Sequence, residues 1–232
     1  MRRVLVTGAA KGLGAAVALL LAKRGYSLVI HYRNSKEAAE QVASFCRQEG
    51  GDAEIIQGDF STIASIETFL EEYKARFKDT YGIVNNVGNY LVAPAESTHL
   101  SAFSSLFESN VLAPFGIMKE LCPLLEKENG AIINIGMAGL NSTYSDSYSP
   151  AYFATKAALF SLTRSFAKEL LPKKIRVNMV SPGYLENAID LPNTLPMGRA
   201  GTTVETAELV AFLLDAGYIT GQNIEIAGGV RA

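Results

Sequence analysis

Short runs of β-branched and other apolar residues alternate with longer amphipathic stretches along the whole chain. This alternation is typical of βαβ units, whose parallel strands are buried on both faces and read as nearly continuous apolar runs. The pattern predicts seven strands separated by helices. The predicted strands are residues 3–7, 27–31, 53–57, 82–85, 131–136, 176–180 and 223–226.

Glycines mark the ends of the first two predicted helices. Residues 12–24 form a helical stretch that ends at Gly25, and residues 36–49 form one that ends at Gly50 and Gly51. Glycine is preferred just past a helix C-terminus because it adopts the left-handed conformation there without strain. Since parallel crossovers are right-handed and helices must cover both faces of the sheet, these elements predict a doubly wound, Rossmann-like α/β fold with three layers.

The composition fits one domain that binds a small molecule. Of the 232 residues 48% are hydrophobic, which is enough for one large core, and no Pro/Gly/Ser-rich linker interrupts the chain, so we expect residues 1–232 to form a single domain. The 21 basic and 23 acidic residues give a net charge of −2 without a block of one sign. This balance argues against a nucleic-acid partner and fits a small neutral or anionic substrate.

The sequence also indicates a cytoplasmic protein. Strand-like residues follow the first three positions at once, which leaves no room for a signal peptide, and no apolar run approaches the roughly 18 to 20 residues that a membrane span requires. The two cysteines, Cys46 and Cys122, have neither a CxxC nor a metal-ligand spacing. We therefore expect no disulfide, no bound metal, no membrane contact and a reducing compartment.

A glycine-rich segment, Thr7-Gly8-Ala9-Ala10-Lys11-Gly12-Leu13-Gly14, joins the first predicted strand to the first predicted helix. Glycines at such a junction let the backbone approach a pyrophosphate, and the helix N-terminus stabilises its negative charge. A lone glycine cluster is usually an ordinary turn, but the position between a strand and a helix favours dinucleotide binding.

With its GxxxGxG spacing this segment resembles the glycine loop of the short-chain dehydrogenase/reductase family, and further motifs extend the resemblance over essentially the whole chain. In chain order these are Gly58-Asp59-Phe60, Asn85-Asn86-Val87-Gly88, Tyr152-x-x-x-Lys156, Pro182-Gly183, Ile219-Thr220-Gly221-Gln222 and Gly228-Gly229. The resemblance implies an oxidoreductase that binds a nicotinamide dinucleotide, with Asp59 and Phe60 beside the adenine. It also implies cofactor contacts from Asn86, Val87, Gly88, Pro182, Gly183 and Leu185.

The residues after the second strand bear on the choice between NAD and NADP. A carboxylate there would accept hydrogen bonds from the ribose 2′-hydroxyl but would repel a 2′-phosphate. The chain instead reads His31-Tyr32-Arg33-Asn34-Ser35, and Lys11 in the glycine loop reaches the same region. Because Arg33 and Lys11 can bind the phosphate's charge, we expect NADPH as the cofactor; two solvated surface charges are the alternative.

Tyr152 and Lys156 lie four residues apart among strong helix formers, so both side chains project from one helix face. A nearby ammonium favours the phenolate, which predicts a lowered pKa for Tyr152 and a role as proton donor to a substrate carbonyl. On many helices the same spacing is only a packed Tyr beside a solvated Lys, but its place between two predicted strands favours catalysis.

The family resemblance implies two further roles near this pair. Lys156 would also hold the nicotinamide ribose, and Asn110 would hold a water between the lysine and bulk solvent, which completes a proton relay. The alternative for Asn110 is a helix-interior Asn that bonds a neighbouring carbonyl.

Two residues depart from the family pattern. Met137 stands at the position aligned with the family's substrate-orienting Ser, and methionine cannot donate that hydrogen bond. Three explanations are open: residues 140–148 supply another hydroxyl, with Ser142 the nearest candidate; the substrate needs only Tyr152; or catalysis is lost. Asn187 stands where many members place Thr against the nicotinamide carboxamide, and an Asn amide can make that contact.

The sequence leaves three functions open. The glycine loop, the Tyr/Lys pair and the Ile-Thr-Gly segment resemble the 3-oxoacyl-acyl-carrier-protein reductases, which implies reduction of a 3-oxoacyl thioester-like carbonyl to an alcohol. The Thr-Gly-Ala-Ala-Lys opening, the His-Tyr basic turn and an Asn-x-x-Ala-Pro helix are similar to the pteridine reductases, which usually carry Asp in place of Met137. The third function is that of a non-catalytic NADPH-binding regulatory protein.

Two longer segments bear on the lid and on assembly. Residues 184–202 lack a helical period and follow the sixth strand, at the edge where ligands bind in such sheets, so we expect a lid over the substrate. The family resemblance implies a homodimer or homotetramer that pairs through helices in residues 101–126 and 150–171.

Overall fold

Seven parallel strands form one sheet in the computed structural model, which describes residues 2–127, 129–142 and 146–230. The strand order is β3-β2-β1-β4-β5-β6-β7, and all seven predicted strands are confirmed to within two residues at each end. The strands are β1 (Arg3–Val6), β2 (Ser27–Tyr32), β3 (Ala53–Gln57), β4 (Gly82–Asn85), β5 (Ala131–Ile135), β6 (Arg176–Pro182) and β7 (Asn223–Ile226).

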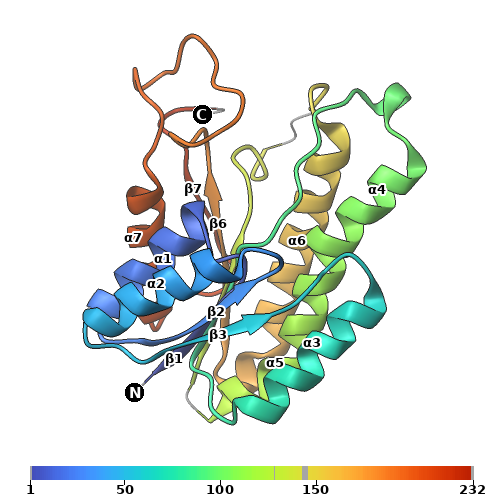
Figure 1. The fold of residues 1–232 in the computed structure, drawn as a ribbon. Coiled ribbons are helices and arrows are strands. Elements are labelled where there is room, and N and C mark those ends of the chain that lie inside the picture. Colours follow the sequence, from blue (N-terminus) through green and yellow to red (C-terminus); the bar gives the residue numbers. More distant parts are fainter. Residues whose placement is uncertain (1, 128, 143–145, 231–232) are drawn as a thin grey trace.

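Helices cover both faces of the sheet and make the three predicted layers (Figure 1). One face carries α1 (Gly12–Lys23), α2 (Lys36–Gln48) and α7 (Thr203–Asp215), and the other carries α3 (Ile63–Arg76), α4 (Leu100–Phe107), α5 (Ala113–Glu126) and α6 (Pro150–Glu169). Each face has its own apolar core: side chains of α1, α2 and α7 pack against the sheet in one, and those of α3, α5 and α6 in the other. The fold is therefore the predicted doubly wound α/β sandwich.

The order in which strands are added to the sheet reverses at β1, and this reversal determines where the candidate site lies. β1 pairs with β2 on one side and with β4 on the other, so the connections that follow β1 and β4 leave toward opposite faces. Ligands of open α/β sheets bind outside the carboxyl ends of the strands at such a point. The glycine loop follows β1, and Asn86, Val87 and Gly88 follow β4, so both motifs lie at this edge.

The long helical segment between β4 and β5 contains a local change of helical pitch. A π-helical turn, η2 (Glu108–Leu112), joins α4 to α5. One-turn π segments inside α-helices occur often at functional sites, because they redirect a side chain that a regular helix would point elsewhere. Here the turn carries Asn110, which is fully buried.

None of the helices in the described residues is both long and apolar enough to cross a membrane. Both cysteines are buried, and neither takes part in a disulfide within the described part of the chain.

Candidate active site

The glycine loop has a backbone that only glycine adopts without strain at two of its positions. Gly8 and Gly12 have φ angles of +63° and +56°, in the left-handed region. A Cβ on Gly14 would lie 2.5 Å from the carbonyl oxygen of Gly8, so a side chain there would push the loop away from α1. The loop is thus a narrow backbone cradle at a helix N-terminus, which fits the pyrophosphate of a dinucleotide.

His31 supports this loop from behind. Its Nδ1 accepts a hydrogen bond from the Gly8 backbone N–H at 3.0 Å, so the ring proton is on Nε2, which lies 3.1 Å from the carbonyl oxygen of Gly58. The ring is buried and stacks on Phe60 at a centroid distance of 4.5 Å. Burial lowers the pKa of His31 to about 4, so the ring is uncharged at neutral pH. His31 therefore holds the loop in shape and contributes no positive charge for a phosphate.

The other residues of the basic turn divide into buried and exposed side chains. Tyr32 is buried against the α1/α2 side of the sheet, whereas Arg33 and Asn34 are exposed and Ser35 is half-buried. Lys11, at the start of α1, is exposed as well. The structure thus leaves both predicted phosphate-binding cations, Arg33 and Lys11, accessible to a ligand.

Asp59 and Phe60, the predicted adenine neighbours, follow β3. The two carboxylate oxygens of Asp59 accept hydrogen bonds from the backbone N–H and the hydroxyl of Ser61, at 3.1 and 2.9 Å. Phe60 is buried and stacks on His31, as described above. The Asp59 carboxylate is therefore fixed beside the end of β3, while Phe60 contributes to the packing beneath the loop.

Asn86 and Thr7 join the ends of β1 and β4. The Asn86 amide donates to the carbonyl oxygens of Thr7 and Gly8, at 2.9 and 3.3 Å. The Thr7 hydroxyl in turn accepts the backbone N–H groups of Asn86 and Val87, at 2.9 and 3.1 Å. These bonds fix the two segments that are predicted to bind the cofactor relative to each other across the sheet.

Lys156 and Asn110 meet behind Gly88. A Cβ on Gly88 would lie 3.0 Å from the Lys156 Nζ and 3.6 Å from the Asn110 Oδ1. The Lys156 ammonium donates to the carbonyl oxygen of Ile135 at 2.8 Å, and burial lowers its pKa to about 8. The Asn110 amide donates to the carbonyl oxygen of Asn89 and to the Thr155 hydroxyl, at 2.9 and 3.0 Å. The predicted relay residues Lys156 of α6 and Asn110 of η2 are thus brought together.

Tyr152 lines a cavity of about 460 Å³ that opens at the carboxyl ends of β4, β5 and β6. The Tyr90 ring contacts the Tyr152 ring edge-on, with centroids 4.8 Å apart and planes at 89°. The Lys156 Nζ lies 5.6 Å from the Tyr152 ring centroid. Other cavity-lining residues include Gly136, Met137, Asp146, Tyr148, Ser149, Pro182, Gly183, Tyr184, Leu185, Asn187 and Asp190.

The pKa of Tyr152 moves in the opposite direction to the sequence-based expectation. Burial raises it above its usual value, and the nearby Tyr90 raises it further. Lys156 does not contribute to the shift: its ammonium donates to the Ile135 carbonyl oxygen and lies 5.6 Å from the centroid of the Tyr152 ring. Without a ligand, Tyr152 is therefore a neutral phenol that holds its proton.

Comparison with known proteins identifies the family of this fold. A family model described as enoyl-(acyl carrier protein) reductase matches residues 8–231. The chain belongs to the short-chain dehydrogenase/reductase family. It is 36% identical to an uncharacterized oxidoreductase of Methylorubrum extorquens (98% of this chain, 96% of the relative) and 31% identical to the 3-oxoacyl-[acyl-carrier-protein] reductase of Staphylococcus aureus (99% and 98%). The solved structure of the landomycin C-6 ketoreductase LanV with bound NADP and rabelomycin superposes with a TM-score of 0.90 at 29% identity (99% of this chain, 96% of that chain).

Within this short-chain dehydrogenase/reductase, the structure does not bring Ser142 into the cavity. Its hydroxyl donates to the carbonyl oxygen of Gly139 at 3.1 Å, and the residue is exposed outside the cavity lining. Glu225 of β7 accepts the backbone N–H of Gly139 at 3.1 Å and holds this turn toward the edge of the sheet. Three other residues predicted within the same loop, 143–145, lie outside the described residues.

The cavity carries hydroxyls of Ser149 and of three tyrosines, Tyr90, Tyr148 and Tyr184. Tyr148 belongs to the loop 140–148 that was expected to supply a hydroxyl, and Tyr184 to the expected lid. Sequence reasoning missed Ser149 and Tyr90, and no local pattern marks Tyr90. Ser149 had a usable signal: it precedes Pro150 at the start of α6 and lies three residues before Tyr152, which places both side chains on one side of the helix start.

Residues 184–202 form the expected loop beyond the carboxyl ends of the strands, and its two ends are held together (Figure 1). The backbone N–H of Gly201 donates to the Tyr184 carbonyl oxygen at 2.9 Å, and that of Glu186 donates to the Gly201 carbonyl oxygen at 2.8 Å. The loop contributes Tyr184, Leu185 and Asn187 to the cavity.

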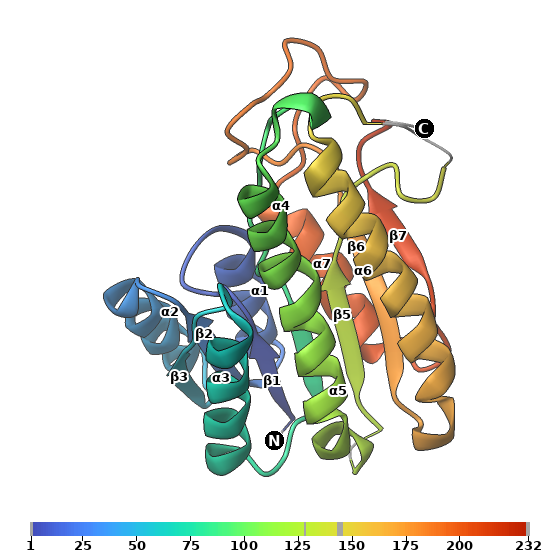
Figure 2. The same ribbon diagram turned by 90° about the vertical axis from the view of Figure 1, so that its right-hand side faces the viewer.

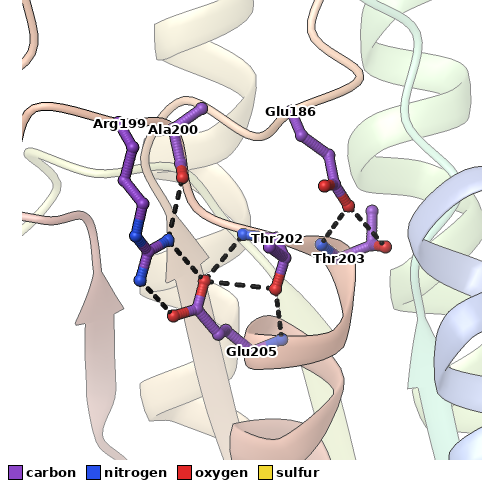
Figure 3. Close-up of polar contacts among 6 residues, drawn as sticks. All are labelled: Glu186, Arg199, Ala200, Thr202, Thr203 and Glu205. Atoms are coloured by element: carbon purple, nitrogen blue, oxygen red, sulfur yellow. Dashed lines mark hydrogen bonds and ion pairs between the residues drawn. The ribbon is translucent and has the colours of Figure 1, made fainter.

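The loop ends in a capped helix, α7 (Figure 3). Thr202 and Glu205 form a reciprocal capping box at its N-terminus, and Arg199 binds the same Glu205 carboxylate at 2.9 and 2.6 Å. On the other side of the chain, the Glu186 carboxylate accepts the backbone N–H of Thr203 at 3.1 Å. These contacts attach both ends of the loop to the start of α7.

Proposed function

We propose that this short-chain dehydrogenase/reductase reduces a carbonyl group of a small molecule to an alcohol with NADPH, and that Tyr152 donates the proton. The observation that carries the proposal is the position of Tyr152, a neutral phenol that lines the cavity at the sheet's carboxyl edge, with the Lys156 Nζ 5.6 Å from its ring centroid. When bound, NADPH would supply the hydride; the protein supplies the proton.

The proposed cofactor site runs along the carboxyl edge of β1, β2 and β4. The backbone of Gly8, Gly12, Leu13 and Gly14 would hold the pyrophosphate, and Gly88, Pro182, Gly183 and Leu185 would face the nicotinamide end. Asn187 lines the cavity with these residues, and its Nδ2 would lie 3.1 Å from a Cβ on Gly12, so its side chain lies between the proposed nicotinamide and pyrophosphate sites. Lys156, which stands behind Gly88, would hold the nicotinamide ribose.

Proton supply to Tyr152 is proposed to follow Lys156 and Asn110. The raised pKa of Tyr152 keeps the proton on the phenol until a carbonyl oxygen develops negative charge. The lowered pKa of Lys156, about 8, makes its ammonium a better acid than an exposed lysine and so a suitable group to return the proton. The buried Asn110 fixes the geometry behind it through Asn89 and Thr155.

Two substrate classes are supported by different observations. The Staphylococcus aureus relative, a 3-oxoacyl-[acyl-carrier-protein] reductase, favours a 3-oxoacyl thioester-like ketone. The rings of Tyr90, Tyr148 and Tyr184 around the cavity favour a flat ring-bearing ketone or a pteridine, since aromatic side chains stack on planar ligands. The LanV structure was solved with rabelomycin.

A substrate panel tests the proposal. The loss of NADPH absorbance is followed with an acetoacetyl thioester, a polycyclic aromatic ketone and a dihydropterin. Turnover of either ketone supports carbonyl reduction, and turnover of the dihydropterin alone would replace it by pteridine reduction. If the protein binds NADPH but reduces none of them, the non-catalytic binding protein becomes the better explanation.

The preference for NADPH is expected to depend on Lys11 and Arg33. Because each cation is exposed at the edge of the proposed adenosine site, replacing both by Ala should weaken NADPH binding by about 10²-fold, the effect of losing charge-assisted hydrogen bonds to a phosphate. NADH binding should change less than threefold, roughly, because NADH carries no 2′-phosphate. Fluorescence titration measures both. Equal losses for the two cofactors would contradict a 2′-phosphate site.

We also propose that the chain assembles as a homodimer or homotetramer through α5 and α6. Leu112 and Phe115 lie partly exposed near the start of α5, and the Phe115 ring contacts Phe166 of α6 edge-on at 5.7 Å. A pair of adjacent helices with exposed apolar side chains is suited to packing against a second copy.

A further inference from the structure

The cavity lacks the hydroxyl that the family resemblance places at position 137. Met137 lines the cavity, and its thioether cannot donate a hydrogen bond to a substrate carbonyl. Tyr152 alone would then have to orient the carbonyl and protonate it. A hydrogen-bond donor to the oxygen of a reacting carbonyl contributes on the order of 10²- to 10³-fold to the rate. A second donor in the cavity would therefore raise the rate strongly.

Ser149 is the cavity hydroxyl that lies nearest to Tyr152 in the chain. It stands at the N-cap position of α6, three residues before Tyr152, and both residues line the cavity. A carbonyl group bound in this cavity would therefore face both residues.

The Ser149 hydroxyl is not used to cap the helix. A Ser at this position usually accepts a backbone N–H of the first helical turn, but here it makes no such bond within the described residues. The Ser149 backbone is fixed instead by Asp146, whose Oδ1 accepts the N–H groups of Tyr148 and Ser149, each at 2.8 Å. The main chain is thus held in place while the hydroxyl stays available to the cavity.

Tyr90 lines the same cavity as Ser149 and contacts the Tyr152 ring edge-on. Burial raises the pKa of Tyr90, and the nearby Ser149 hydroxyl acts in the opposite direction. Ser149 itself is only 2% exposed, whereas Tyr90 is 48% exposed at the cavity rim. Tyr90, Ser149 and Tyr152 therefore surround the same part of the cavity.

We propose that Ser149 donates the substrate-orienting hydrogen bond that Met137 cannot give. The proposal rests on the proposed function, because it assigns a second donor for the same carbonyl. Tyr152 gives up its proton to that oxygen, while Ser149 keeps its own proton and only binds the oxygen as it gains negative charge.

Ser149→Ala tests the assignment in steady-state reduction of the best substrate from the panel. We expect kcat and kcat/KM to fall together by about 10²-fold, because the lost bond strengthens only as negative charge develops on the oxygen. The thermal midpoint should stay close to that of the wild type, because the hydroxyl caps no backbone group. Ser149→Thr, which keeps the hydroxyl, should retain most of the activity.

A rescue variant separates a missing donor from a general disturbance of the site. Met137→Ser in the Ser149→Ala background returns a hydroxyl to the family position. We expect the kcat of this double variant to be at least about tenfold higher than that of Ser149→Ala. The matched control is Ser165→Ala on the exposed side of α6, where the hydroxyl bonds only the carbonyl oxygen of Ser161 at 3.1 Å. This control should leave both kinetic constants unchanged.

Three results would overturn the assignment. Wild-type kcat in Ser149→Ala would show that its hydroxyl is not used. A Tyr90→Phe variant that loses as much kcat as Ser149→Ala would identify Tyr90 as the donor, whereas we expect a loss below about tenfold. If Ser142→Ala loses most of its kcat while Ser149→Ala keeps full activity, Ser142 is the substrate-orienting donor. If Tyr152→Phe is inactive while Ser149→Ala is fully active, only this inference fails; an inactive wild type would remove it together with the proposed function.

Discussion

Tyr152→Phe is expected to lower kcat for carbonyl reduction by about 10²- to 10⁴-fold, the contribution of a positioned proton donor. The substitution removes one oxygen and keeps the ring, so the edge-on contact with Tyr90 at 4.8 Å survives. NADPH binding and the thermal midpoint should therefore change little. The measurements are single-turnover NADPH oxidation and fluorescence titration of the same preparations.

The control for this variant is Tyr218→Phe, which removes a hydroxyl from a fully exposed tyrosine between α7 and β7. It should match the wild type in every measurement. If Tyr152→Phe retains turnover within tenfold of the wild type, roughly, the proton comes from another group and the proposed role of Tyr152 is wrong.

The pH profile offers a second check on Tyr152. Burial and Tyr90 raise its pKa above the usual 10.0, so the phenol stays protonated at neutral and mildly alkaline pH. The reduction rate should therefore show no loss from ionisation of Tyr152 below about pH 10. A fall in kcat that Tyr152→Phe abolishes, and that begins near neutral pH, would contradict the raised pKa.

Lys156→Met is expected to remove activity and to stabilise the fold at neutral pH. Burial lowers the pKa of Lys156 from 10.5 to about 8, so the folded protein carries a desolvated ammonium at pH 7. At about 1.4 kcal/mol per pKa unit, relief of that penalty is worth up to about 3 kcal/mol. The Ile135 carbonyl then loses its donor, which costs about 1–3 kcal/mol, so we expect a net gain of about 1 kcal/mol.

The sign of the pH effect follows from the direction of the shift. Between about pH 8 and pH 10.5 the folded state has lost the Lys156 proton while the unfolded state still binds it, so Lys156 makes stability rise with pH in this window. Below pH 8 both states bind the proton, and the full penalty remains. The stability difference between Lys156→Met and the wild type should therefore be largest near pH 7 and should shrink toward pH 10.5.

The matched control is Lys168→Met in the last turn of the same helix, where the lysine is exposed. It should lose a few tenths of a kcal/mol, about the value of a cation near a helix C-terminus, and keep its activity. Denaturant unfolding at pH 7 and pH 10 measures both variants. A wild type more stable than Lys156→Met at pH 7, or an equal difference at the two pH values, would show that the buried ammonium carries no penalty.

The sequence alone was enough to predict the seven strands, the layers and the glycine loop. These depend on local properties: apolar runs long enough for a buried strand, glycines where the backbone is left-handed, and the four-residue spacing of Tyr152 and Lys156. Such properties survive folding because neighbours in the chain stay neighbours in the structure. The family motifs added the prediction of which of these segments meet at the carboxyl edge of the sheet.

The tertiary structure decided which hydroxyl faces the cavity and how each ionisable group is charged. The sequence favours Ser142 as the replacement donor, yet Glu225 of β7 holds the Ser142 turn away from the cavity and Asp146 holds Ser149 at the cavity. His31 looks like a phosphate-binding group in a basic turn, but Phe60 and Gly58 bury it in an uncharged form. The pKa of Tyr152 rises because of desolvation and of the nearby Tyr90. Desolvation depends on segments brought together from across the whole chain, and no local pattern contains it.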